Sequence, residues 1–296
     1  MLREAIDSVL AQTYRPIEVI VVDDGSTDET GEVADELATR HAELRVIHQQ
    51  NGGPGLAREA GRLLARGAYI QHLDSDDLLL PRKFELQTAA LAAAPQSDVA
   101  YGWTRFRLTN GTVEAPAWKR SGERIETMFP SMLTSRWWDT ATPLYRAAVI
   151  AAAGPWTDLR VEEDWEYDCR IASQGVRLAF VEDWVCEIRQ RGAPYNAPAH
   201  LRDRARAHLL MLQHARNAGL ENESAAMQFF ARDLFHLARQ CGIEGLPEES
   251  RQLIAAARSI SNARDLRAFE LAGRTLGFSR VARGARWFER LRAHVR

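Results

Sequence analysis

The stretch IEVIVVDDGSTD, residues 17–28, decides the fold class of this chain. Its first part, Ile17–Asp23, is a short apolar run rich in β-branched residues, bounded by a proline and by a Gly-Ser pair. A continuous apolar run of this length predicts a strand buried on both faces, as in a parallel sheet. Ligands of such sheets bind at the carboxyl ends of the strands, so Asp23 and Asp24 are candidate site residues, with a helix-capping turn as the alternative.

Strand and helix patterns alternate after this run. The periodicity predicts strands at Leu44–His48 and Ala68–Leu73 and helices at Asp28–Arg40, Gly55–Arg66 and Arg82–Ala93. Alternation at this spacing favours βαβ units and a mostly parallel sheet.

The pattern changes after Ala93. Ser97–Leu108, followed by Asn110-Gly111, predicts an antiparallel hairpin, because Asn-Gly readily adopts the positive φ of a tight turn. Later segments predict a helix at Glu162–Ser173 and two short strands at Leu178–Val181 and Val185–Ile188.

Composition shifts near residue 195, which predicts an α/β domain over residues 1–195 and a helical region over 196–296. Met227, Phe230, Leu234 and Leu237 follow the 3-4 spacing of an amphipathic helix. Residues 264–296 hold nine arginines against three acids. Such basic helices can rest on anionic lipid, associate with one another, or pack on the α/β domain with a solvated arginine face.

Overall composition limits the function classes. The chain has 296 residues, a formal net charge of −2, 46% hydrophobic and 26% charged positions. Balanced charge argues against a nucleic-acid partner, and no apolar run reaches the roughly 18 residues of a membrane span. The three cysteines are an odd number and lie far apart, which favours a reducing cytoplasm.

A second acidic cluster, Asp74, Asp76 and Asp77, directly follows the predicted strand Ala68–Leu73. Carboxylates so close together raise one another's pKa unless a cation lies between them, and all-oxygen ligation suits Mg²⁺ or Mn²⁺ shared with substrate phosphates. The alternative is a solvated turn that caps the next helix. The pattern lacks the glycine of an EF-hand loop, and the chain contains no Walker loop.

The third acidic group, Glu162, Glu163 and Asp164, opens a predicted helix. Carboxylates are favoured there by the helix dipole, whereas a carboxylate beside a metal–diphosphate can act as a general base. Periodicity alone leaves both interpretations open.

The order of these motifs resembles the family-2 glycosyltransferases, which share the nucleotide-sugar-binding A-type fold, a Rossmann-like mixed, mostly parallel sheet. The matching stretches cover residues 1 to about 192: LREAIDSVLAQT from Leu2, EVIVVDDGSTD from Glu18, Asn51–Arg58 with GAYIQHLDSDD from Gly67, and Glu163-Asp164-Trp165.

The resemblance implies roles for individual residues. Asp24, with its neighbour Asp23, would hold the nucleotide base, and Arg58 would lie in the nucleotide region. Asp76 would bind Mn²⁺ or Mg²⁺ directly, with Asp74 as the other acid of the D-x-D, nearer the ribose. Asp164 would deprotonate the acceptor hydroxyl in an inverting displacement, and Arg189 and Arg191 would lie near the diphosphate.

The chain also departs from the family pattern. Relatives begin with an apolar strand just before the helix matched by Leu2–Thr13, and its absence predicts a groove between two neighbouring strands. Glu59 and Arg191 replace a frequent Asn and His, and the membrane spans of processive synthases are missing. The sequence thus predicts an enzyme that moves one sugar from a nucleotide-diphosphate sugar to a hydroxyl acceptor. The alternative is a non-catalytic nucleotide-sugar binder that acts through its helical region.

Overall fold

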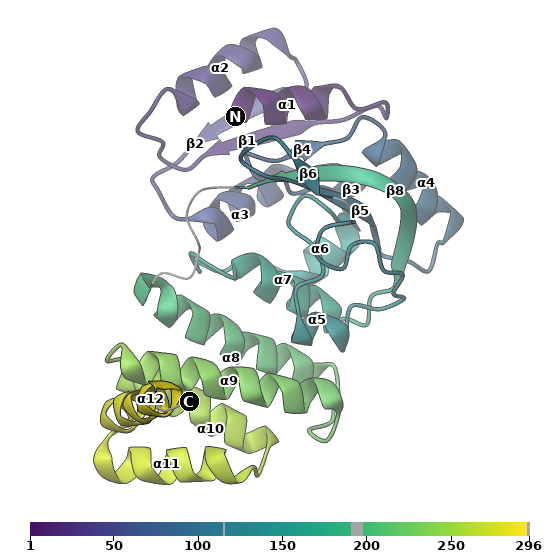
Figure 1. The fold of residues 1–296 in the computed structure, drawn as a ribbon. Helices are drawn as coiled ribbons and strands as arrows, with labels where there is room; N and C mark the ends of the chain where they lie inside the picture. The colour runs from purple at the N-terminus through teal and green to yellow at the C-terminus, as the bar shows by residue number, and fades with distance from the viewer. Residues whose placement is uncertain (115, 191–197, 295–296) are drawn as a thin grey trace. The chain divides into compact units, whose positions relative to one another are not determined.

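The computed structural model describes residues 1–114, 116–190 and 198–294, and divides the chain into two compact units, Met1–Pro194 and Tyr195–Arg296. The first unit is a mixed α/β fold and the second is built from helices (Figure 1). No helix among the described residues is both long and apolar enough to cross a membrane.

The first unit begins with alternating helices and strands. Their bounds are α1 Leu2–Leu10, β1 Val19–Asp23, α2 Thr30–Arg40, β2 Leu44–His48, α3 Pro54–Leu64, β3 Tyr69–Ile70, β4 Leu78–Leu79 and α4 Lys83–Ala93. The predicted strands and helices of this region are confirmed to within a few residues. The exception is β3, which is shorter than predicted because its ladder partner β7 is only three residues long.

The rest of the unit completes the larger sheet. Its elements are β5 Val99–Arg107, β6 Val113–Glu114, α5 Ser131–Thr134, β7 Leu144–Arg146, α6 Ala147–Ala153, α7 Glu163–Ala172 and β8 Leu178–Arg189. Strands β5 and β6 form the predicted antiparallel hairpin. The order of the larger sheet is β3-β7-β5-β8-β4, while β1 and β2 form a separate parallel pair. The two parallel ladders, β1 with β2 and β5 with β8, are the longest.

The prediction of two short strands near residue 180 was wrong, because β8 runs without a break from Leu178 to Arg189. The ladder with β5 shifts register on either side of Trp103, and this irregularity accommodates Glu182 and Asp183, which separate the two predicted strands. Gly102, on β5, lets this strand approach β8 closely at the register shift. A Cβ at this position would lie 2.8 Å from the carbonyl oxygen of Val181.

Apolar residues from β4, β5, β7 and β8 pack with α4 to form a hydrophobic cluster, which includes Leu79, Leu91, Ala100, Leu144 and Val185. A smaller cluster joins α1, α2 and β2 through Ile6, Leu37 and Leu44.

A cavity of about 600 Å³ lies between β1 and β3, with α1 and α3 also lining it. In the described chain β1 pairs only with β2 and β3 only with β7, so each strand has an open edge at this cavity. None of the five residues of β1 is buried, although four are apolar. The groove predicted from the sequence is therefore present.

The second unit consists, in its described part, of a short 3₁₀ turn at Pro198–His200 and α8 Leu201–Asn217, α9 Ala225–Ile243, α10 Pro247–Ile260, α11 Arg264–Leu276 and α12 Phe278–His294. The residues predicted to form an apolar stripe, Met227, Phe230, Leu234 and Leu237, are all buried on α9. The serine that precedes α9, Ser224, caps it by accepting a hydrogen bond from the Met227 amide.

Candidate active site

The predicted acidic groups lie at the ends of β1 and β3 and at the start of α7, and one buried arginine joins two of them. Arg58, on α3, donates from Nη2 to Asp74 Oδ1 and from Nη1 to Glu163 Oε1, each at 2.6 Å. Burial alone would lower the pKa of Arg58, but Asp74, Glu163 and Asp164 together raise it. The arginine predicted for the nucleotide region thus connects the D-x-D segment to the helix that carries Asp164.

Asp24 holds the loop that precedes α3. Its carboxylate accepts the backbone amides of Gly52 and Gly53 at 2.8 and 2.7 Å and the side-chain amide of Gln49 at 2.7 Å. Gly53 has a φ of 92°, a conformation that glycine adopts without strain. Asp24 therefore shapes the loop at the carboxyl end of β1, where a nucleotide is expected.

Asp23 has different partners. Its Oδ1 accepts the amide of Ser26 at 3.0 Å, and its Oδ2 lies 2.9 Å from Nδ1 of His48. The hydrogen bond to Ser26, with a further contribution from His48, lowers the pKa of Asp23. The structure therefore brings Asp23 to the same loop region as Asp24, but directs it toward β2.

The D-x-D segment is anchored to β8. Asp77 Oδ1 accepts the backbone amide of Arg189 at 3.0 Å, and the Arg189 guanidinium bonds the carbonyl oxygen of Asp76 and the carboxylate of Glu4. Burial raises the pKa of Asp77 to about 7. Arg189 thus lies beside the predicted metal ligand Asp76, whereas Arg191 falls outside the described residues.

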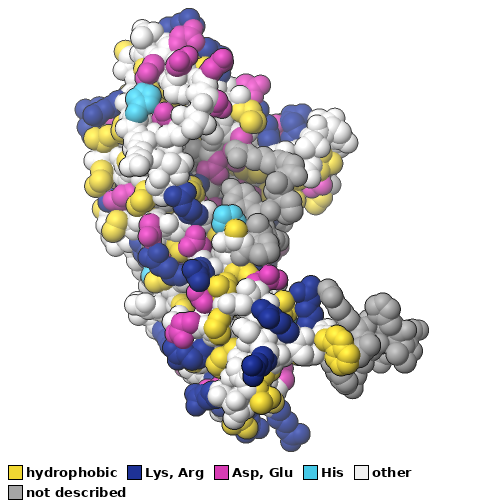
Figure 2. Space-filling view, turned by 90° about the vertical axis from the view of Figure 1, so that its left-hand side faces the viewer, with side chains coloured by type: hydrophobic (Ala, Val, Ile, Leu, Met, Phe, Trp, Pro, Cys, Tyr) yellow, Lys and Arg dark blue, Asp and Glu magenta, His cyan; other side chains and the backbone are white. Residues whose placement is uncertain are grey.

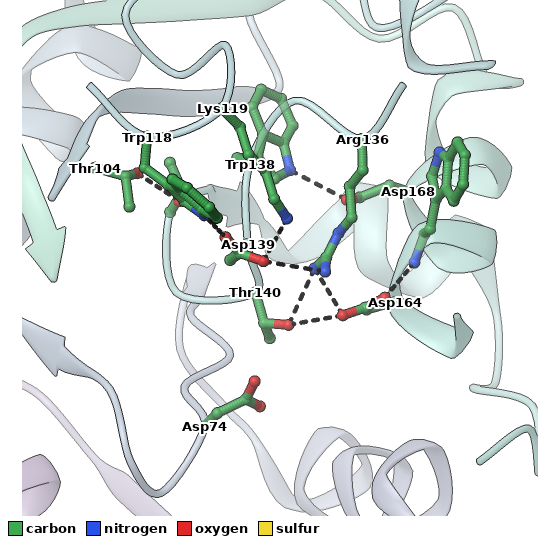
Figure 3. Close-up of polar contacts among 12 residues, drawn as sticks. Asp74, Thr104, Trp118, Lys119, Arg136, Trp138, Asp139, Thr140, Asp164 and Asp168 are labelled. Atoms are coloured by element: carbon green, nitrogen blue, oxygen red, sulfur yellow. Dashed lines mark hydrogen bonds and ion pairs between the residues drawn. The ribbon is translucent and has the colours of Figure 1, made fainter. Parts of the chain in front are cut away.

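Asp164 lies in the cluster drawn in Figure 3. Its Oδ2 is 2.7 Å from Arg136 Nη2 and 3.3 Å from the Thr140 hydroxyl, and its Oδ1 accepts the Trp165 amide at 2.7 Å. Burial raises the pKa of Asp164, but the attraction of Arg136, Arg58 and Lys119 outweighs it, and the net effect is a lowered pKa. Asp164 is therefore held as a carboxylate.

Its neighbour Glu163 shows the opposite shift. Burial raises the pKa of Glu163 to about 7, and the charge of Asp164 adds to this effect, although Arg58 opposes it. The two consecutive carboxyls at the start of α7 therefore differ in basicity. This separation is the pattern by which active sites assign distinct roles to neighbouring acids.

The chemistry of Asp74 and Asp76 fits a divalent cation shared with a substrate. Among the described residues no group of three or more potential ligands could hold a metal by itself. Mg²⁺ in nucleotide sites, however, is held by only one or two carboxylates together with phosphate oxygens. Asp74 is 38% exposed and uses Oδ1 alone for Arg58, so within the described chain its Oδ2 remains available.

Sequence reasoning missed several residues of this site. Arg136, Lys119 and Asp139 lie on irregular segments, and no recognisable motif or spacing pointed to them. Lys119 has a φ of 54° and Glu162, before α7, has a φ of 58°. These are the only left-handed non-glycine residues in the described chain, and residues in this conformation concentrate at functional sites.

Tryptophan side chains can stack on sugars, but Trp137, Trp138 and Trp156 are core residues. Trp156 stacks on Tyr167 with ring centroids 3.9 Å apart. Trp103 is half-buried, with its ring centroid 5.5 Å from that of Trp184.

Known proteins with similar sequences are glycosyltransferases. Residues 1–146 match the family model of glycosyl transferase family 2. The chain is 28% identical over 269 residues to the uncharacterized glycosyltransferase EpsJ of Bacillus subtilis, covering 86% of this chain and 78% of that protein. It is 44% identical over 83 residues to glycosyltransferase GlyG of Streptococcus pneumoniae, which covers 28% of each chain.

Two solved structures share the fold. S. aureus TarS 1-349 in complex with UDP-GlcNAc aligns with a TM-score of 0.68 and 21% identity, over 97% of this chain and 88% of that one. Mannosyltransferase PcManGT from Pyrobaculum calidifontis, in complex with GDP-Man and Mn²⁺, aligns with a TM-score of 0.52 and 17% identity, over 96% and 78%.

The fold and the family match define a glycosyltransferase with an A-type α/β domain and a helical C-terminal part. Within that class, residues 1–146 form a domain that matches glycosyl transferase family 2.

Proposed function

We propose that this protein is an inverting, divalent-cation-dependent enzyme that transfers one sugar from a nucleoside-diphosphate sugar to a hydroxyl acceptor. The observation that carries the proposal is the buried bridge of Arg58 between Asp74 and Glu163, because it ties the donor-side acids to the helix that presents Asp164. A merely structural acidic turn would have no need of this link.

On the donor side, Asp23 and Asp24 lie at the carboxyl end of β1 and would border the base and ribose. Asp76 and Asp74 would hold Mn²⁺ or Mg²⁺. That cation would neutralise charge on the diphosphate as the nucleotide leaves. Arg189, which touches the backbone of Asp76, would add positive charge at the same end of the site.

On the acceptor side, Asp164 would act as the general base. It takes the proton of the acceptor hydroxyl while the hydroxyl oxygen bonds to the anomeric carbon from the face opposite the diphosphate. The bond from that carbon to the diphosphate oxygen breaks, and its electron pair leaves with the nucleoside diphosphate. A single displacement of this kind inverts the anomeric configuration, and the base contributes about 10²–10⁴ in rate.

The helical region would mediate contacts with an anionic membrane surface or with a second copy. Leu271, Leu276 and Trp287 are more than 60% exposed. Arginine side chains gather beside apolar ones on the visible face of this unit (Figure 2). Sedimentation with phosphatidylserine vesicles and light scattering test the two kinds of contact.

All three cysteines are free and buried, which suits the cytoplasm proposed for the enzyme.

The test of the proposed function is turnover of a panel of UDP, GDP and dTDP sugars with Mn²⁺, Mg²⁺ or EDTA. We expect Asp164→Asn to lower turnover at least 100-fold while donor affinity changes little. Asp168→Asn is the matched control. Asp168 lies one turn later on α7, where it accepts hydrogen bonds from Trp138 and Tyr145, so its loss should affect stability rather than turnover.

Three outcomes would contradict the proposal in different ways. Donor binding without hydrolysis or transfer, across the whole panel, would favour the non-catalytic nucleotide-sugar binder. Full activity in EDTA would refute the proposed dependence on a divalent cation. Retention of the anomeric configuration in the product would refute the proposed single displacement.

A further inference from the structure

Asp164 is held by a second arginine that belongs to no sequence motif. Arg136 follows α5, and its Nη2 is 2.7 Å from Asp164 Oδ2. The same guanidinium reaches Asp139 Oδ1 at 3.3 Å and Thr140 Oγ1 at 3.3 Å (Figure 3). Arg136 therefore contacts the proposed base and a second carboxylate at the same time.

Arg136 itself has little freedom to move. Its side chain is only 18% exposed, and Asp139, its other partner, is fixed from the opposite side. Asp139 accepts hydrogen bonds from the Trp118 indole at 2.7 Å and from Lys119 Nζ at 2.6 Å. Asp139, which anchors the Arg136 guanidinium, is thus itself anchored by Trp118 and Lys119.

The hydrogen bonds of Asp164 differ between its two oxygens. Oδ2 accepts hydrogen bonds from the Arg136 guanidinium and the Thr140 hydroxyl, and these two donors occupy both of its lone-pair directions. Oδ1 receives only the Trp165 amide within the described chain. One lone pair of Oδ1 is left for the acceptor hydroxyl.

We propose that Arg136, anchored by Asp139, is the positioning residue for Asp164: it holds Oδ2 so that Oδ1 faces the acceptor, and it keeps the base ionised in mild acid. This inference rests on the proposed function. Arg136 would act through Asp164 and not by contact with substrate or cofactor.

Asp139 explains how Arg136 keeps a counter-ion during the reaction. When Asp164 takes the acceptor proton, it loses its negative charge, and a lone buried arginine would then be left without a counter-ion at a large cost. Asp139, whose Oδ1 lies 3.3 Å from Arg136 Nη1, takes no part in this proton transfer and still contacts Arg136. The pair Arg136–Asp139 therefore keeps its geometry while Asp164 cycles between its two protonation states.

Other charged groups also act on Asp164, and a pH test has to account for them. They come from a loop, from α3 and from α7 itself: Lys119, Arg58, Glu163 and Asp168. Asp139 and Asp74 act through the arginines that they contact, Arg136 and Arg58. Arg136 makes the only direct ion pair with Asp164 that the described residues contain. Its removal should therefore change the ionisation of Asp164 more than the other groups can compensate.

The experiment measures kcat and kcat/KM from pH 5 to 9 for Arg136→Gln and Arg136→Lys. An opposite charge in contact lowers the pKa of a carboxyl by about 1–3 units, so we expect the acid limb of Arg136→Gln to move up by about that amount. Arg136→Lys should restore part of the shift. Arg251→Gln is the control, because Arg251 forms an exposed ion pair with Glu248 on α10 and should leave the profile unchanged.

An equal loss of rate at every pH in Arg136→Gln would overturn the inference, since it would indicate a structural role alone. If that variant does not fold, Asp139→Asn replaces it. Removing the competing carboxylate should move the acid limb downward, and an unmoved limb contradicts the proposal. Should Asp164→Asn remain fully active, the proposed function fails; should it be inactive while Arg136→Gln shows no shift, only this inference fails.

Discussion

Arg58 is the residue whose loss tests the architecture of the site most directly. It is buried and donates to Asp74 and Glu163 at 2.6 Å each. We expect Arg58→Gln to lower the free energy of unfolding by about 3–5 kcal/mol, because removing one partner of a buried ion pair leaves the other charge unpaired. Arg66→Gln is the control. Arg66 is 86% exposed and pairs with Glu18, so its loss should cost about 0–1 kcal/mol.

The pH dependence of this loss has a definite sign. Burial raises the pKa of Glu163 to about 7, above its unfolded value, so ionised Glu163 opposes folding as the pH rises toward neutrality. Arg58 is the main group that counters this effect. The cost of Arg58→Gln should therefore be larger at pH 8 than at pH 5.5, and Glu163→Gln in the same chain should recover part of it.

Urea unfolding followed by tryptophan fluorescence at the two pH values measures these differences. The reasoning is refuted if Arg58→Gln costs no more than Arg66→Gln, or if its cost is the same at both pH values. Either result would mean that the bridge between the D-x-D segment and α7 contributes little to the folded state.

Three further predictions concern other parts of the first unit. Gly61→Ala should stabilise α3 by about 1 kcal/mol in thermal unfolding, since its Cβ would meet β1 side chains at ordinary distances, whereas Gly55→Ala should destabilise because its Cβ would lie 2.1 Å from the Thr157 carbonyl oxygen. Burial lowers the pKa of Lys83 to about 7, so the unfolded chain binds a proton that the folded chain lacks. Stability should then rise from pH 7 to 9 by up to about 1.4 kcal/mol per pH unit, and this slope should be missing in Lys83→Met; equal slopes would contradict the assignment. Asp24→Ala should weaken UDP binding in a thermal-shift titration, because the backbone amides of Gly52 and Gly53 lose the carboxylate that holds their loop. Unchanged affinity would mean that this loop conformation does not contribute to donor binding.

Much of the fold was predictable from local patterns. β2 was predicted to the residue at Leu44–His48, and α4 began within one residue of its expected start. Such elements depend on side-chain periodicity and nearby chain breakers, which a linear sequence displays. The continuity of β8 was not predictable, because it depends on a register shift against β5 that involves residues about eighty positions away.

The individual acids of the site were also visible in the sequence, since Asp74, Asp76 and Asp164 stand in short motifs at the ends of predicted elements. Their partners were not visible. Arg136 contacts Asp164 across 28 positions and Arg58 contacts Glu163 across 105, and no spacing rule joins residues so far apart.

The sequence by itself determined the α/β alternation, the acidic groups at strand and helix ends, and the helical character of residues from His200 onward. Each of these follows from interactions between residues close along the chain. Only the tertiary structure decided which basic side chain meets which acid, which oxygen of Asp164 stays available, and that β1 and β3 face one cavity. Those features depend on burial and on distances between remote segments, which arise when the chain packs.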